Sequence, residues 1–327
     1  MRVLIVKLSS LGDVVHTMPV VHDIHAAYPD ALVDWVVEPG FAPLVRRVQG
    51  IHSSIECALR RWRKRWWTSQ VRREWREFRD AIHGEPYDAV IDFQGLTKSA
   101  LIARLARGPR YGLANRTEGA SHEWPARWLV HHPIRIEPHT HALDRARLLA
   151  SRVFGYELKG SPQFGLRRQT LEATERTLVF VHGTSRDDKL WPEEHWIEIG
   201  RRVMLAGWRI ALPHAGSVER ERAERIAQAI GPACEVWPQM GLDALTDRMG
   251  AAHGVIGVDS GLSHIAVALD LPHVQIYNHP TAWRTGPLAE HGYAYQVCVE
   301  AQPSPDVESV WAAWKQVWAQ FREAGQR

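Results

Sequence analysis

Short apolar runs alternate with helix-periodic segments along most of the 327-residue chain, and this alternation limits the fold more than any other feature. Apolar runs typical of buried strands lie at 2–8, 33–38, 53–58, 87–93, 177–183, 209–214, 234–237, 254–258 and 273–277. Segments with helical spacing lie at 13–27, 193–206, 219–230, 241–252 and 262–269. Such alternation is typical of parallel α/β units, and a chain of this length suits two domains of about 150 residues.

The segment 160–177 separates the two halves, because it lacks periodicity and is rich in turn formers and charge. We therefore expect two Rossmann-like parallel-sheet domains, at 1–165 and 166–306. The last segment, 307–327, places four aromatic residues on one helical stripe: Trp311, Trp314, Trp318 and Phe321. This stripe predicts an amphipathic helix. We expect it to pack back on the N-terminal domain, with ordinary core packing as the alternative.

Composition excludes several classes of protein. The cysteines Cys57, Cys234 and Cys298 are far apart and form no CxxC pair, which argues against a disulfide framework or a zinc site and fits a reducing cytosol. The first residues hold too few apolar side chains for a signal peptide, and no run approaches the roughly 18 apolar residues of a membrane span. The 18 histidines show no ligand spacing, so no metal is expected. We expect a cytosolic protein with a membrane-surface partner.

The loop after the first strand, "KLSSLGD", holds Ser10, Gly12 and Asp13. Ligands of open parallel sheets bind beyond the carboxyl ends of the strands, so two such sheets facing each other predict a site in an interdomain cleft. Gly12 permits a tight turn with close backbone approach. Asp13 either caps the following helix or takes a proton from a bound group, and its position alone favours the cap.

Three loops in the second half suggest a nucleotide site. In "VFVHGTSRDDKLWPEEHW" (179–196), Thr184, Ser185 and Lys189 suit a diphosphate, although a capped loop with a solvated lysine is equally compatible. In 254–272, a helix N-terminus with unpaired N–H groups follows a strand. A plain cap there would explain Asp259 or Ser260 but not their combination with Gly261 and His264.

The third loop contains Glu219, which could accept hydrogen bonds from ribose hydroxyls. Taken alone, Glu219 is better explained as a favourable charge in the first turn of a helix. The chain has no full GxGxxG, P-loop or DxD motif. Their absence weakens a dehydrogenase, a P-loop NTPase and a metal-dependent sugar transferase, respectively.

The run "RRWRKRWW" at 60–67 carries five cations between Arg60 and Arg65. Cations interleaved with aromatic residues suit nucleic acid or a lipid-borne acceptor with sugar carboxylates and phosphates, and a solvated face is the common outcome of charge runs. Five cations cannot all be buried, and tryptophans beside them are costly to leave in water. We favour acceptor docking.

Together, "KLSSLGDVVHTMPVV", "RRWRKRWW", "YDAVIDFQGLTKSA" (87–100), "TSRDDKLWPEEHW" and "VDSGLSHIAVALDLP" resemble the lipopolysaccharide heptosyltransferases. The "RRWRK" and "DDKLWPEEHW" forms are most similar to heptosyltransferase I. The resemblance covers essentially the whole chain. It implies a GT-B glycosyltransferase fold and transfer of L-glycero-D-manno-heptose from ADP-heptose to a Kdo residue of Kdo–lipid A, with inversion, without cofactor or metal.

The resemblance also implies roles for single residues. Asp13 would be the base and Lys189 would assist catalysis at the departing ADP. Residues implied at the donor are Thr184, Ser185, Lys189, Glu219 at the ribose, Met240 at the adenine, Asp259, Ser260, Gly261 and His264. Residues implied at the acceptor are Ser10, Gly12, Arg60, Arg61, Arg63 and Lys64. The expected protein is a monomer that binds no nucleic acid and lies in the cytoplasm, peripheral on the inner membrane.

Three alternatives remain open. Heptosyltransferase II or III would act on an already heptosylated core. A nucleotide-sugar epimerase of the same fold would need no basic acceptor surface. A cytosolic nucleic-acid or membrane-surface binder would explain 60–67 but would leave the loops at 184–189 and 259–264 without a role.

Overall fold

The computed structural model describes residues 1–118, 120, 122–169, 171 and 175–325, which form two units, Met1–Arg167 and Arg168–Arg327. The boundary expected from the sequence lay between residues 165 and 166. The connecting segment is held from both sides. Leu166 pairs with Val48, and Arg167 N donates to Arg47 O at 2.9 Å. Gln169 N donates to Asp247 Oδ1 at 2.7 Å in the second unit.

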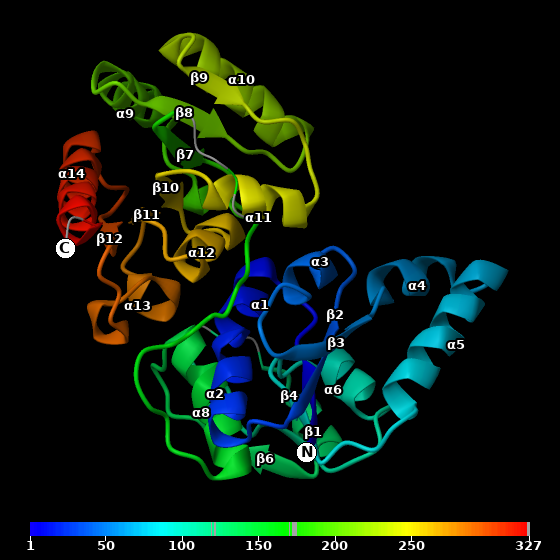
Figure 1. The fold of residues 1–327 in the computed structure, drawn as a ribbon. Coiled ribbons are helices and arrows are strands. Elements are labelled where there is room, and N and C mark those ends of the chain that lie inside the picture. Colours follow the sequence, from blue (N-terminus) through cyan, green and yellow to red (C-terminus); the bar gives the residue numbers. More distant parts are fainter. Residues whose placement is uncertain (119, 121, 170, 172–174, 326–327) are drawn as a thin grey trace. The chain divides into compact units, whose positions relative to one another are not determined.

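The N-terminal unit is a parallel sheet of six strands with helices on both faces (Figure 1). Its strands are β1 (Arg2–Val6), β2 (Leu32–Val37), β3 (Ile51–Glu56), β4 (Ala89–Asp92), β5 (Arg110–Leu113) and β6 (His132–Ile134), in the order β3-β2-β1-β4-β5-β6. Its helices are α1 (Leu11–Thr17), α2 (Pro19–Ala27), α3 (Ala42–Val45), α4 (Leu59–Arg65), α5 (Ser69–His83), α6 (Thr97–Ala103), α7 (Ala126–Leu129) and α8 (Ala142–Phe154). Leu4 and Val6 face α5 and α6, where they pack with Phe78 and Ile102.

The C-terminal unit repeats this arrangement. Its strands are β7 (Thr177–Val181), β8 (Arg209–Leu212), β9 (Cys234–Val236), β10 (Gly254–Val258), β11 (His273–Tyr277) and β12 (Gln296–Glu300), in the order β12-β11-β10-β7-β8-β9. Its α-helices are α9 (Glu193–Leu205), α10 (Ser217–Ile230), α11 (Leu242–Gly250), α12 (Gly261–Ala268), α13 (Ala282–Thr285) and α14 (Val307–Gly325), with short 3-10 helices at Asp187–Lys189 and Ala289–His291. Both sheets have the Rossmann strand order, so the predicted α/β class is confirmed.

The C-terminal helix α14 packs on its own unit, and the expectation that it returns to the N-terminal domain is wrong. Trp314 is 1% exposed and lies in one core with residues of β7, β10 and α9. Its ring meets Trp208 with centroids 5.6 Å apart, and Trp318 meets Trp208 at 4.7 Å. The aromatic stripe therefore packs against the core of the C-terminal unit.

Two expectations about the first loop and helix are also corrected. The single helix expected at 13–27 is in fact two helices. Met18 is both the C-cap of α1 and the N-cap of α2, and α2 begins at Pro19. Gly12 lies inside the first turn of α1 and forms no separate tight turn.

Candidate active site

The strand order reverses between β1 and β4 in one sheet and between β7 and β10 in the other. Open α/β sheets bind ligands at this switch point, beyond the carboxyl ends of the strands. Asp13 follows β1, and Phe93 follows β4. Thr184 and Lys189 follow β7, and Asp259 follows β10 directly. These five residues therefore lie at the switch point of their sheets, and four of them (all but Phe93) were predicted site residues.

Asp13 divides its carboxylate between two tasks. Its Oδ2 accepts hydrogen bonds from the backbone N and hydroxyl of Ser10, at 3.2 and 2.8 Å, which closes the N-terminus of α1. Its Oδ1 pairs with Lys7 Nζ at 3.3 Å. Both interpretations left open by the sequence thus have a geometric basis, since one oxygen caps the helix and the other, paired with Lys7, belongs to a side chain that remains partly exposed.

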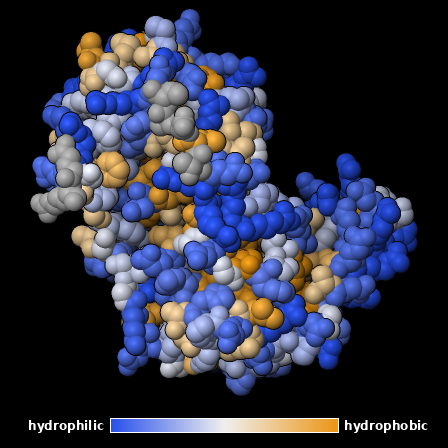
Figure 2. Space-filling view, in the orientation of Figure 1, coloured by the Kyte–Doolittle hydropathy of each residue, from blue (hydrophilic) through white to orange (hydrophobic). Residues whose placement is uncertain are grey.

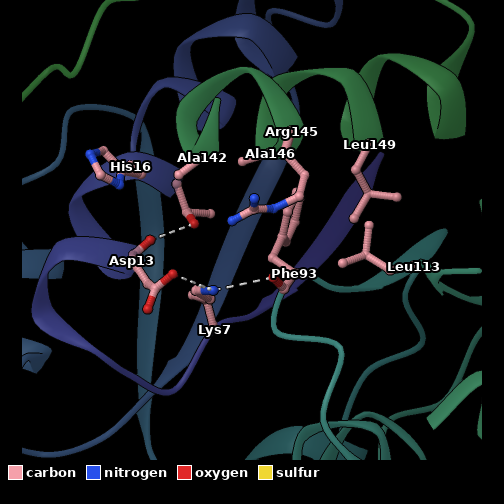
Figure 3. Close-up of a pocket in the computed structure, with 10 residues that line it drawn as sticks. Lys7, Asp13, His16, Phe93, Leu113, Ala142, Arg145, Ala146 and Leu149 are labelled. Carbon is pink, nitrogen blue, oxygen red and sulfur yellow. Dashed lines mark hydrogen bonds and ion pairs between the residues drawn. The ribbon is translucent and has the colours of Figure 1, made fainter. Parts of the chain in front are cut away.

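Lys7 is held tightly beside this carboxylate (Figure 3). Its ammonium also donates to Phe93 O at 3.2 Å, and the buried Trp35 donates to Lys7 O at 3.1 Å. Burial alone would raise the pKa of Asp13, but the Lys7 charge and the Ser10 hydrogen bonds outweigh it and lower the pKa to about 2. The Asp13 side chain is 39% exposed, so an ionised carboxylate faces solvent at this edge.

A polar cavity of about 240 Å³ lies beside Asp13. It is lined by Lys7, Ser9, Ser10, Asp13, Phe93, Gln94, Leu96, Lys98, Leu113, Ala120 and Arg145. Figure 3 shows Arg145 reaching from α8 into the space beside Asp13 and Lys7. Three cations therefore surround one carboxylate, an arrangement that suits an acidic ligand which presents a hydroxyl group.

Asp92 lies beneath the loop after β4, whose residues Phe93 and Gln94 line this cavity. It is 1% exposed and accepts hydrogen bonds from Gln94 N at 2.9 Å and Ser99 Oγ at 2.9 Å. Burial raises its pKa to about 6 against these hydrogen bonds. Gln94 in turn accepts from Leu8 N at 2.9 Å, which ties the loop after β4 to the loop after β1.

Sequence reasoning assigned no role to Lys7, Arg145 or Asp92. Lys7 looked like the polar end of a strand, and Asp92 lay within the quoted 87–100 motif without a function. Arg145 comes from α8, 132 positions after Asp13, and no local pattern marks it.

The basic residues of α4 begin at the same sheet edge but do not line the cavity. Arg60 pairs with Glu38 at 3.1 Å, and Glu38 N donates to Leu8 O at 3.1 Å. Arg61 pairs with Glu74 at 2.6 Å. Arg63 and Lys64 are exposed and form no ion pair within the described part of the chain. Their acceptor role stays a prediction.

In the C-terminal unit, Asp259 joins the predicted donor loops. Lys189 Nζ donates to Asp259 Oδ2 at 2.5 Å, and Thr184 Oγ1 donates to the backbone O of Asp259 at 3.0 Å. His264 Nε2 lies 3.4 Å from Asp259 Oδ1. Burial opposes ionisation of Asp259, but His264 and Lys189 outweigh it and lower its pKa well below the usual range.

This corner retains unused hydrogen-bond donors. Ser260 is the N-cap of α12, and its buried hydroxyl has no partner among the described residues. Gly261 begins the helix, whose first amides lack intrahelical partners. The Lys189 side chain is 31% exposed, and only one of its three donors is used by Asp259. Hydroxyl, amides and ammonium together suit a diphosphate.

Glu219 lies against the same loop. In α10 it accepts from Ala215 N at 2.7 Å, and its carboxylate lies 2.7 Å from the point where a side chain on Gly183 would begin. Glu219 thus does lie in the first turn of a helix, where one of its carboxylate oxygens accepts a backbone hydrogen bond. Gln239 donates to Ala215 O at 3.2 Å. This hydrogen bond holds the loop that contains the half-buried Met240 next to the loop before Glu219. Ser185 is exposed. The nucleotide roles of these residues stay predictions.

Comparison with known proteins identifies the family. A profile of glycosyltransferase family 9 (heptosyltransferase) matches residues 75–314. Lipopolysaccharide heptosyltransferase 1 from Escherichia coli K12 is 40% identical over 305 residues, which cover 91% of this chain and 93% of that protein. The chain belongs to glycosyltransferase family 9. The suspected resemblance is confirmed, and the protein is an enzyme of this class.

Other family 9 proteins refine the placement. Lipopolysaccharide heptosyltransferase 2 from the same strain is 23% identical over 308 residues, which cover 88% of this chain and 86% of that protein. Solved structures of E. coli heptosyltransferase WaaC match over 99% of this chain. The one with ADP has a TM-score of 0.83 at 35% identity and 99% coverage of that chain, and the one with ADP-2-deoxy-2-fluoro heptose has 0.80 at 36% identity and 100% coverage. The GT-B fold class is therefore confirmed.

Proposed function

We propose that this family 9 enzyme transfers L-glycero-D-manno-heptose from ADP-heptose to a Kdo residue of Kdo–lipid A, in the inner core of lipopolysaccharide. The observation that carries the proposal is the ionised, partly exposed Asp13 in a cavity with three cations. Kdo supplies both a hydroxyl and a carboxylate, which match this set of charges. The higher identity to heptosyltransferase 1 than to heptosyltransferase 2 supports the subtype.

The transfer is a single displacement. The acceptor oxygen bonds to the anomeric carbon as the bond from that carbon to the ADP phosphate breaks, and ADP leaves with the electron pair. The acceptor proton passes to Asp13. In an oxocarbenium-like transition state the attacking oxygen becomes strongly acidic as it bonds to carbon, so a carboxylate with a pKa of about 2 suffices as the base.

The donor corner would serve the departing ADP. Lys189, the Ser260 hydroxyl and the first amides of α12 provide donors for the diphosphate, whose negative charge grows as the bond breaks. Asp259 would hold Lys189 in place and contact the heptose.

Location and assembly belong to the same proposal. An acceptor anchored in a membrane requires the enzyme to work at the membrane surface, and the proposed site of action is the cytoplasmic face of the inner membrane, as a monomer. Among the described residues, no helix combines the length and apolar character needed to cross a bilayer.

The test is incubation of the purified protein with ADP-heptose and Kdo–lipid A, with mass spectrometry of the product. Asp13→Asn keeps an acceptor oxygen for the α1 cap but removes the base. We expect a loss of turnover of about 10²–10⁴-fold, with ADP binding retained. Near-normal turnover in this variant contradicts the base assignment. Transfer only to an already heptosylated core assigns the protein to heptosyltransferase II or III instead.

A further inference from the structure

Helices α4 and α5 form a hairpin at the edge of the N-terminal sheet, joined by the turn Trp66–Thr68 (Figure 1). Thr68 caps α5 by accepting from Val71 N at 3.3 Å, and Arg72 Nη2 donates to Trp67 O at 3.2 Å. The base of the hairpin is anchored in the core, where Trp62 is 6% exposed. The turn is thus a defined structure on a fixed base.

The turn exposes two tryptophans. Trp66 and Trp67 are 69% and 60% exposed, and their rings meet edge to face with centroids 6.3 Å apart. Indole rings are rarely left in water without a partner, because burial of so large an apolar surface is strongly favourable. Their position at a helix–helix turn keeps them away from the core of their own unit.

Cations flank the two rings on both sides. Between Arg60 and Arg79 the sequence holds nine basic and two acidic residues. Three cations precede the turn and three follow it on α5 without an acidic partner among the described residues: Arg63, Lys64, Arg65, Arg72, Arg73 and Arg76. Figure 2 shows a mostly hydrophilic surface over this hairpin.

We propose that this turn docks on an anionic phospholipid bilayer, with Trp66 and Trp67 in the boundary between headgroups and acyl chains and the flanking cations at the lipid phosphates. Indoles prefer this boundary because one end of the ring system is apolar and the other carries a polar N–H. Each basic residue near an anionic surface adds attraction.

A single-stranded nucleic acid is the competing partner, since it also uses cations and aromatic rings. Successive bases stack best on rings presented in a groove with a common direction. Here the two ring planes are 82° apart, and they lie on a turn rather than in a groove. This geometry favours insertion into a lipid interface over base stacking.

This inference goes beyond the proposed function, because neither tryptophan belongs to the acceptor or donor residues, although Arg63 and Lys64 are shared with the predicted acceptor residues. It rests on that function only in that a lipid-borne acceptor brings the enzyme to a membrane. Binding to vesicles is therefore measured without donor or acceptor, so that the two proposals fail separately.

The experiment is flotation of the full-length protein with phosphatidylcholine vesicles, with and without phosphatidylglycerol, at about 0.15 M salt. Trp66→Ser/Trp67→Ser should lower the partition coefficient on anionic vesicles about tenfold, or about 1.4 kcal/mol. Trp124→Ser/Trp128→Ser removes a matched pair, 61% and 66% exposed, on the same unit and should leave binding unchanged. Arg65→Gln/Arg73→Gln should weaken binding and flatten its salt dependence.

Unchanged vesicle binding in the Trp66/Trp67 variant overturns the proposal, as does an equal loss in the Trp124/Trp128 control. Retention of the wild type on single-stranded DNA but not on anionic vesicles also overturns it. Heptosyl transfer to a soluble, deacylated acceptor should be unchanged in the Trp66/Trp67 variant, and its loss would assign the turn to the acceptor site instead. Vesicle binding by a protein that transfers no heptose would leave this inference standing and reject the proposed function.

Discussion

Asp13 has a low pKa because two kinds of partner hold its negative charge. Lys7 supplies the largest single favourable contribution, and Ser10 adds two hydrogen bonds. These interactions stabilise the loop but also make the carboxylate a weak base. The same group is therefore compatible with catalysis only where the proton it receives comes from an acidified oxygen.

The low pKa has a consequence for pH dependence. Asp13 has a pKa of about 2 in the folded protein, against about 3.9 in an unfolded chain. Because the folded value is the lower one, the stabilisation is complete above about pH 4 and is lost as the pH falls toward 2. Heptosyl transfer should show no acid limb from Asp13 above about pH 4.

Lys7→Met should move that limb, because burial then opposes ionisation of Asp13 without the ammonium to offset it. We expect the acid limb of single-turnover transfer to shift to higher pH. The loss of stability that protonation of Asp13 causes in acid should shrink, because the folded pKa is no longer held far below the unfolded one. Lys98→Met is the matched control, since Lys98 lines the same cavity but does not pair with Asp13. An acid limb at the same pH in both variants and the wild type would falsify the role of Lys7.

Lys189 offers a separate test in the other unit. Its loss removes charge-assisted hydrogen bonds to the diphosphate, each worth about 1.5–3 kcal/mol. Lys189→Met should therefore weaken ADP binding by roughly 10–150-fold in calorimetry. Lys315→Met changes an exposed lysine on α14 and should not alter the affinity. Equal affinities for all three proteins would contradict the donor assignment.

Helix α14 was predictable from its local sequence pattern, but the core that it packs against was not. The period of Trp311, Trp314, Trp318 and Phe321 gives the helix and its apolar face, but it does not say which core receives that face. The answer depends on Gly254 in β10, where a side chain would begin 2.3 Å from Trp314. That glycine leaves room for the ring.

Trp314→Ala should destabilise the protein by about 3–5 kcal/mol, because a fully buried indole leaves a cavity. Chemical denaturation monitored by circular dichroism measures the change. Trp311→Ala, on the partly exposed side of the helix, should cost clearly less. A loss below about 1 kcal/mol for Trp314→Ala would mean that the helix is not part of the C-terminal core.

The sequence predicted nine strands, and β5, β6 and β12 were missed for physical reasons. The β5 segment "RYGL" and the β6 segment "HPI" are short and partly exposed, and Pro133 is tolerated because β6 is an edge strand. β12 is an edge strand of the C-terminal sheet and is only partly buried. Buried strands show long apolar runs, whereas these three partly exposed strands do not.

The site was predictable where it follows strand ends and not where it depends on distant chain segments. Asp13, Lys189 and Asp259 lie directly after apolar runs, so the position of the strand reveals them. The contribution of Arg145 depends on the packing of α8 beside α1. No spacing in the sequence encodes that contact.

Each half of the molecule has its own core and its own ligand edge. The cores around β1 and around β7 draw their described residues from separate halves of the chain. ADP should therefore act on the C-terminal unit alone, where all the predicted donor residues lie.

Hydrogen exchange with and without ADP tests this division. We expect protection in the loops after β7, β8, β9 and β10, and unchanged exchange around Asp13 and α1. At about 100 times the dissociation constant, ADP should add about 2.7 kcal/mol to the stability of the unit that binds it. Protection confined to the N-terminal unit would reverse the assignment of donor and acceptor.

The shared strand order also determines where the molecule can be altered without harm. Every predicted ligand contact in the sheets follows a carboxyl strand end, whereas the exposed turn Gly84–Pro86 precedes β4 at the amino end. A fluorophore or surface tether attached at that turn would therefore report on the enzyme, or immobilise it, while leaving both chemical faces accessible.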